Sequence, residues 1–110
     1  MYEVRKDGKF LNGQAVDTFS MVADEGDASF EVEVGTNGFK GEDSRVYLKL
    51  VNVGNSNFMA RFVEDEHGKP VGIELAFDGE EAFAALMKVI DFAVNVICDQ
   101  AEEPVRRCGA

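Results

Sequence analysis

The stretch Gly79–Asp99, GEEAFAALMKVIDFAVNVICD, decides how the rest of the chain must be arranged. Its acidic first turn and the apolar run over 82–98 predict one long helix near the C-terminus. Only Lys88, Asp91 and Asn95 interrupt the run, and on a period of 3.6 they fall on one narrow stripe. A helix that is apolar around most of its circumference must be covered on two sides.

Two apolar faces can be distinguished on this helix. The broader face consists of Phe83, Leu86, Met87, Ile90, Val94 and Ile97. We expect this face to pack on a sheet. The second face carries Val89, Phe92 and Val96 and needs a different cover. Either the N-terminal segment wraps over it or a second copy does, and we expect a two-fold homodimer.

Four segments in the middle of the chain alternate apolar and polar residues with a period of two, which is typical of half-buried strands. They lie near residues 30–34, 46–52, 58–64 and 71–77. Before them, Asp7-Gly8 and Asn12-Gly13 have the composition of hairpin turns. Residues 17–23 are either a further strand or a short helical turn.

These elements predict an α+β fold in a single domain over 1–103, followed by a flexible tail over 104–110. The fold is an antiparallel four- to five-stranded meander with an N-terminal hairpin-like extension, and the long helix packs on one face. That face is expected to carry Phe30, Leu48, Phe62 and Leu75.

The composition limits the partners. The 110 residues include 21 acidic and 11 basic ones, which gives a net charge of -10. Direct nucleic-acid binding is not expected, because phosphate contacts need Lys and Arg, whereas a protein with a basic surface would be attracted. The N-terminus lacks a signal-like apolar run and the helix is too short and too charged to span a bilayer, so we expect a cytoplasmic protein that does not bind membranes. Cys98 is expected to pack as a free thiol, and a disulfide with Cys108 is the less favoured alternative.

The densest group of special residues is the loop Gly35–Asp43, which contains Gly35, Thr36, Asn37, Gly38, Phe39 and Gly41. Such a loop can bind an anion through its backbone N–H groups, but Glu42 and Asp43 would repel one. These carboxylates could instead join Asn37 around a hard cation, although the spacing is not that of an EF-hand. We favour a shaped turn without a ligand. The alternative function is a small ligand- or metal-binding domain, or an enzyme, that uses this loop.

His67 lies in the polar turn 64–70 among three carboxylates, where it could act as an acid, a base or a weak metal ligand. A solvated turn is the simpler interpretation. None of the serines has a candidate partner for a hydrolytic triad other than His67. We therefore expect no catalytic residues, no metal site, no cofactor and no enzymatic activity.

The run Phe30–Gly41, FEVEVGTNGFKG, followed by Asp43, resembles a motif of small uncharacterised proteins from bacteriophages and mobile elements. In that family an acidic strand enters a Gly-Thr-x-Gly-aromatic loop, which continues through Gly-Gly-Asp into a strand. The similarity covers roughly residues 29–99 and departs at Glu42, where the family has a second glycine. The resemblance implies binding to host proteins, including defence machinery, and the host-cell cytoplasm as the location of a phage-encoded protein.

Together these observations predict a small acidic, non-enzymatic interaction protein of phage or mobile-element type. We expect it to inhibit a host nucleic-acid-handling or defence complex, as anti-CRISPR proteins do. The expected partner-binding residues are Glu31 and Glu33 on a strand with Glu42 and Asp43 in the loop, gathered at one edge of the sheet. This edge would dock on a basic groove of a host protein. The alternative is a charged edge strand that is protected against aggregation.

Overall fold

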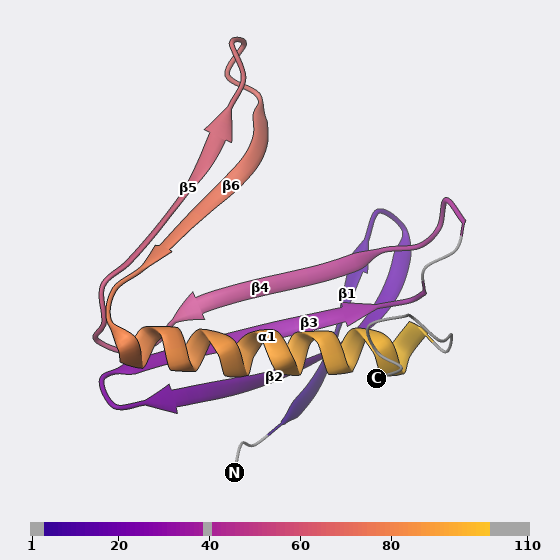
Figure 1. Ribbon diagram of the computed structural model, residues 1–110. Coiled ribbons are helices and arrows are strands. Elements are labelled where there is room, and N and C mark those ends of the chain that lie inside the picture. The colour runs from indigo at the N-terminus through magenta and orange to yellow at the C-terminus, as the bar shows by residue number, and fades with distance from the viewer. Residues whose placement is uncertain (1–3, 39–40, 102–110) are drawn as a thin grey trace.

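A computed structural model of the chain describes residues 4–38 and 41–101. One antiparallel sheet consists of β1 (Arg5–Leu11), β2 (Gln14–Glu25), β3 (Ala28–Thr36) and β4 (Val46–Asn52), arranged in sequence order. A second sheet is the hairpin of β5 (Phe58–Glu64) and β6 (Pro70–Phe77), and the helix α1 (Glu80–Ala101) follows. The predicted α+β fold, with a meander and one long C-terminal helix, is confirmed (Figure 1).

The N-terminal hairpin turns at Asn12-Gly13, where both residues have positive φ, 47° and 84°. This is the backbone of a tight turn that suits the twist of two antiparallel strands. Asp7-Gly8 is not a turn, because both residues lie within β1 and pair with β2. The ambiguous segment 17–23 is a strand, and it places β2 in the interior of the main sheet.

The helix α1 lies across β3 and β2 on one face of the main sheet (Figure 1). The buried core between them consists of Met21, Ala23, Ala28, Phe30, Val32, Ala82, Ala85 and Val89. Two of the helical contacts are alanines, and their small side chains let the helix backbone approach the sheet closely. The predicted tail, residues 104–110, lies outside the described residues.

The helix is rotated relative to the sequence-based prediction. Three residues of the broad face that was expected on the sheet, Phe83, Met87 and Ile90, are 64%, 44% and 43% exposed, whereas Leu86, Val94 and Ile97 are partly buried. Polar contacts set the rotation. Glu81 accepts a hydrogen bond from the N–H of Asp27 at 3.0 Å, and Lys88 forms an ion pair with Glu25. These contacts draw the polar stripe of the helix toward β2 and the β2–β3 turn.

The prediction that Val89, Phe92 and Val96 form a dimer face is therefore wrong. Val89 is only 4% exposed and belongs to the buried core, and Phe92 packs against that core. Val96 lies further along the same side of the helix and is partly buried. These residues cover β2 and β3 of their own chain.

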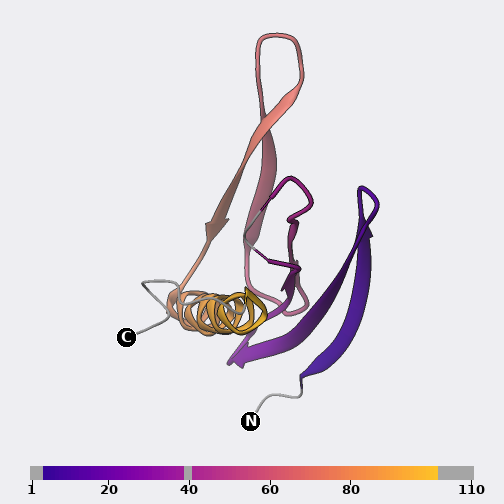
Figure 2. The same cartoon turned by 90° about the vertical axis from the view of Figure 1, so that its right-hand side faces the viewer.

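The hairpin of β5 and β6, called the arm below, projects away from the main sheet (Figure 2). The linker after β4 explains this direction. Val53 donates its N–H to the carbonyl of Ser29 at 2.9 Å, and Asn55 donates to that of Asp27 at 3.0 Å. The chain thus continues in the direction of β4 as far as the β2–β3 turn instead of reversing beside β4. The prediction that β5 and β6 extend the main sheet is wrong.

Three phenylalanines join the base of the arm to the main core. Phe58 of β5 and Phe77 of β6 lie 5.1 Å apart between ring centroids, and they lie 5.7 and 5.3 Å from Phe30 of β3. Beyond this cluster the helix does not cover the apolar face of the arm. Leu48 on β4 is also uncovered, so three members of the predicted sheet face, Leu48, Phe62 and Leu75, are exposed.

Candidate functional site

The predicted partner-binding residues Glu31 and Glu33 lie on an interior strand. They point away from α1, as expected from the alternation, but β3 lies between β2 and β4. The predicted acidic edge is therefore wrong. The strand that carries these residues has a neighbour on each side, and their counter-charges come from β4 (Lys49) and from β1 (Arg5 and Lys9), the strand beyond β2.

Glu33 is buried in a cluster of polar side chains on this face. Its carboxylate accepts a hydrogen bond from the Thr18 hydroxyl at 2.6 Å and lies 3.7 Å from the ammonium groups of both Lys9 and Lys49. Glu31 pairs with Arg5 at 3.0 Å. A carboxylate held in this way already has its hydrogen bonds and its counter-charge within the chain.

The same face forms a hollow of about 280 Å³, lined by Arg5, Lys6, Asp7, Lys9, Ser20, Glu31, Glu33 and Lys49. Its four cationic and three anionic side chains nearly balance, so it is not an acidic surface. Sequence reasoning missed this balance because Arg5, Lys9 and Lys49 are far from Glu31 and Glu33 in the chain and meet them only through strand pairing.

The loop Gly35–Asp43 is organised by Arg45, which sequence reasoning did not single out. Its guanidinium donates to the carbonyls of Leu11, Asn12, Glu42 and Ser44. Its backbone N–H donates to the Asn37 side chain at 2.7 Å, and the Asn37 amide donates to the Asp43 carbonyl at 3.0 Å. Arg45 and Asn37 thus bond to the backbone of the described loop residues, and Arg45 ties the loop to the β1–β2 turn, which is consistent with a shaped turn.

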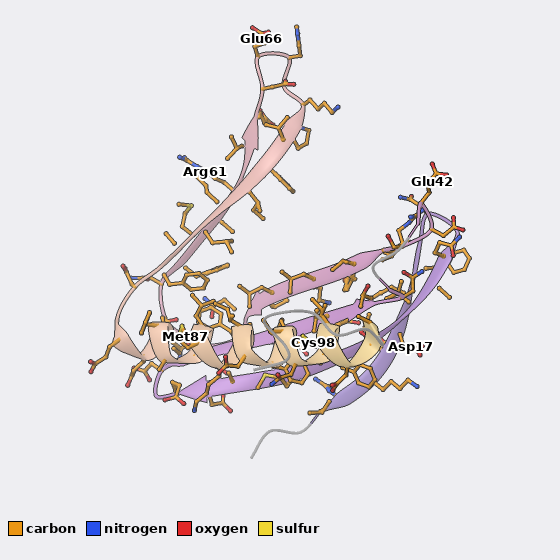
Figure 3. The ribbon with its side chains drawn as sticks, turned by 45° about the vertical axis from the view of Figure 1, so that its right-hand side comes forward. Asp17, Glu42, Arg61, Glu66, Met87 and Cys98 are labelled. Atoms are coloured by element: carbon orange, nitrogen blue, oxygen red, sulfur yellow. The ribbon has the colours of Figure 1, made fainter. Side chains whose placement is uncertain are left out.

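Each glycine that the structure describes in this loop has its own role. At Gly35 a Cβ would overlap the carbonyl oxygen of Asp17 on the neighbouring strand. Gly38 and Gly41 have positive φ, 133° and 83°, which favours glycine. Phe39 lies outside the described residues. Glu42 and Asp43 are exposed at the loop, apart from Glu31 and Glu33, and Figure 3 shows Glu42 at the loop tip.

A hollow of about 440 Å³ lies beside this loop, lined by Ala15, Asp17, Thr36, Asn37, Asp99 and Gln100. Gln100 at the end of α1 spans it. Its side-chain oxygen accepts the N–H of Thr36 at 2.9 Å, and its side-chain nitrogen donates to the Asp17 carbonyl at 2.7 Å. These bonds hold the helix end to the sheet.

His67 is solvent-exposed and follows Glu66, which Figure 3 shows at the tip of the arm. Asp65 shapes this turn by accepting the backbone N–H groups of His67 and Lys69, at 2.8 and 3.0 Å. Over residues 4–38 and 41–101, no group of three or more His, Cys, Asp or Glu side chains could hold a metal ion. Within residues 4–38 and 41–101, the imidazole of His67 has one charged partner, the Glu66 carboxylate, with Nε2 and Oε1 3.7 Å apart.

Charge is unevenly distributed over the described surface. Six basic side chains form ion pairs within the chain: Arg5, Lys6, Lys9, Lys49, Arg61 and Lys88. Exposed carboxylates gather where the β2–β3 turn meets the start of α1. Asp24 comes from the end of β2 and Asp27 from the turn. Asp78 precedes α1, Glu80 begins it, and the bond from Asp27 to Glu81 joins the turn to the helix. These residues are called the acidic end below.

Comparison with protein-family models, with curated proteins and with solved structures finds no match. Within the described part of the chain, no helix is long and apolar enough to cross a membrane. Cys98 is disulfide-bonded, so the expectation of a free thiol is wrong. Cys108 lies outside the described residues.

Proposed function

We propose that this chain is a non-enzymatic interaction protein that binds a basic protein surface through its acidic end. The observation that carries the proposal is the distribution of charge. The described basic side chains pair mostly with carboxylates of their own chain, whereas Asp24, Asp27, Asp78 and Glu80 project into solvent at one end. A net charge of -10 adds a long-range attraction toward a cationic partner.

The kind of partner is a further part of the proposal. A basic protein surface is often one that otherwise holds nucleic acid, and the motif at 30–43 resembles one from phage and mobile-element proteins. We therefore propose a host nucleic-acid-handling or defence complex as the target, and inhibition by occupation of its basic groove as the action. The acidic end replaces the edge around Glu31 and Glu33 as the proposed contact.

The test is the salt dependence of binding to a partner captured from a host-cell lysate. Association driven by charge should slow by about tenfold or more between low and high salt. The double variant Asp27→Lys/Glu80→Lys should slow association at low salt to a similar extent. Neither side chain forms an ion pair or hydrogen bond in the described structure, so the exchange should leave the fold intact.

The matched control is Glu64→Lys/Glu66→Lys, which makes the same change in charge at the arm. If its effect equals that of Asp27→Lys/Glu80→Lys, total charge governs binding and the acidic end is not the contact. Binding that is independent of both salt and these substitutions would refute the proposal as a whole.

A further inference from the structure

The helix covers only half of the main sheet. It packs on β3 and β2. On the helix-side face of β4, Leu50 packs against the core, whereas Val46 and Leu48 are exposed. Leu48 pairs with Val34 in register, so both side chains point to the helix side of the sheet. Val34 is fully buried, whereas Leu48 is 65% exposed and Val46 is 56% exposed. The sheet face therefore changes from core to open surface between two neighbouring strands.

The outward flank of α1 continues this open surface. The polar flank is held over β2 by the Lys88–Glu25 ion pair, so the opposite flank lies toward β4. That flank carries Phe83, Met87 and Ile90, all exposed, and Figure 3 shows Met87 on the helix. The residues Val46, Leu48, Phe83, Met87 and Ile90 are called the uncovered surface below.

The arm has an apolar face of its own. Phe62 and Ile73 are cross-strand partners on one side of the hairpin, and they are 68% and 62% exposed. Leu75 lies on the same side. The other side carries the Arg61–Glu74 ion pair. An isolated two-stranded hairpin is at best marginally stable in water, so its apolar face needs a partner.

The area left open is large for a chain of this mass. The accessible surface of all 110 residues is 7641 Å², whereas a folded monomer of 12.1 kDa exposes about 6000 Å². The radius of gyration is 15.3 Å, against about 13 Å for a compact chain of this length. A standard interface buries about 800 Å² on each partner. The uncovered surface and the apolar face of the arm offer eight apolar residues for such a contact, each more than 40% exposed: Val46, Leu48, Phe62, Ile73, Leu75, Phe83, Met87 and Ile90.

We propose that the arm of each copy lies on the uncovered surface of a second copy, in a two-fold dimer with reciprocal arms. The arm and the uncovered surface belong to the same chain. A two-fold axis that places the arm of one copy on the uncovered surface of the other therefore also forms the reciprocal contact. The arm cannot reach β4 of its own chain, because the linker is bonded to the β2–β3 turn. Among the described strands, β4 is at the edge of the main sheet, and an arm strand can pair with it.

This arrangement is independent of the proposed function. It uses uncharged side chains, and the acidic end remains outside the contact. A dimer that binds no basic partner and a monomer that binds one are distinguishable results.

The experiment is light scattering over a range of protein concentrations. Wild type should be a dimer at micromolar concentration. Phe62→Glu on the arm and Leu48→Glu on β4 should each give a folded monomer and weaken association at least 100-fold. Met59→Glu, on the other side of the arm, is the matched control and should leave the dimer intact. Circular dichroism verifies folding, and Val46→Glu serves in place of Leu48→Glu if that variant does not fold.

Mixing the two monomeric variants distinguishes reciprocal arms from other dimers. One copy then keeps an intact arm and the other an intact surface, so one of the two contacts re-forms and a mixed dimer appears. If Leu48→Glu and Val46→Glu remain dimeric, the arms contact each other and the proposal is overturned. A wild type that is monomeric at about 100 micromolar also overturns it, because interfaces of standard size have dissociation constants from the micromolar range downward.

Discussion

The rotation of the helix can be tested by two neighbouring substitutions, Val89→Ser and Ile90→Ser. The sequence pattern predicts that Ile90 packs on the sheet, whereas the structure buries Val89 and leaves Ile90 43% exposed. Val, Ile and Ser have similar helix propensities, so a difference between the two losses of stability reports how deeply each replaced side chain is buried. The Leu48→Glu background removes any contribution from the proposed second copy.

The expected losses follow from the environment of each side chain. Removing the buried valine costs about 1.5–3 kcal/mol of apolar burial, and a buried hydroxyl without a partner adds about 1–3 kcal/mol. Val89→Ser should therefore lower the free energy of unfolding by about 2.5–6 kcal/mol, and Ile90→Ser by about 1 kcal/mol. At about 4–8 °C per kcal/mol, the Val89 variant should melt at least about 10 °C below the Leu48→Glu protein.

Urea unfolding followed by circular dichroism measures both variants. The slope of the transition should be unchanged, because the same surface is exposed on unfolding. If Ile90→Ser destabilises the protein as much as Val89→Ser, the helix is rotated toward the face that the sequence predicted.

Three further predictions concern the sheet and the loop. Gly35→Ala places a methyl group against the Asp17 carbonyl, so it should cost at least about 1–3 kcal/mol in a urea titration, and a neutral result would contradict the close packing. Glu33→Gln should destabilise by about 1–3 kcal/mol, less than for a fully buried pair because its two lysine partners can reach water. Glu31→Gln is the control and should cost under about 1 kcal/mol, and equal losses would contradict the different burial of the two carboxylates. A thermal-shift panel of metal ions and nucleotides should leave the melting temperature unchanged, because the loop after Gly35 is bonded within the chain, and a concentration-dependent rise would instead identify a ligand.

Local patterns in the sequence determined the elements of this protein. Alternation over 46–52 and 58–64 predicted β4 and β5 with the observed bounds, and the apolar run after Gly79 predicted α1. Asn12-Gly13 predicted the first turn, because both residues tolerate positive φ. Each of these signals depends on the preferences of residues that are close together in the chain. The same signals predicted a shaped turn over Gly35–Asp43, and that interpretation stays a prediction.

Tertiary contacts decided how those elements meet. The helix has two apolar faces that its own periodicity cannot rank, and the bonds of Glu81 to Asp27 and of Lys88 to Glu25 select one of them. The partners in each bond are more than fifty residues apart, so no local pattern contains them. Likewise, the bonds of the linker after β4 direct the arm away from the main sheet. The counter-charges of Glu33 also come from distant strands, so a run that is acidic in sequence becomes balanced in the fold.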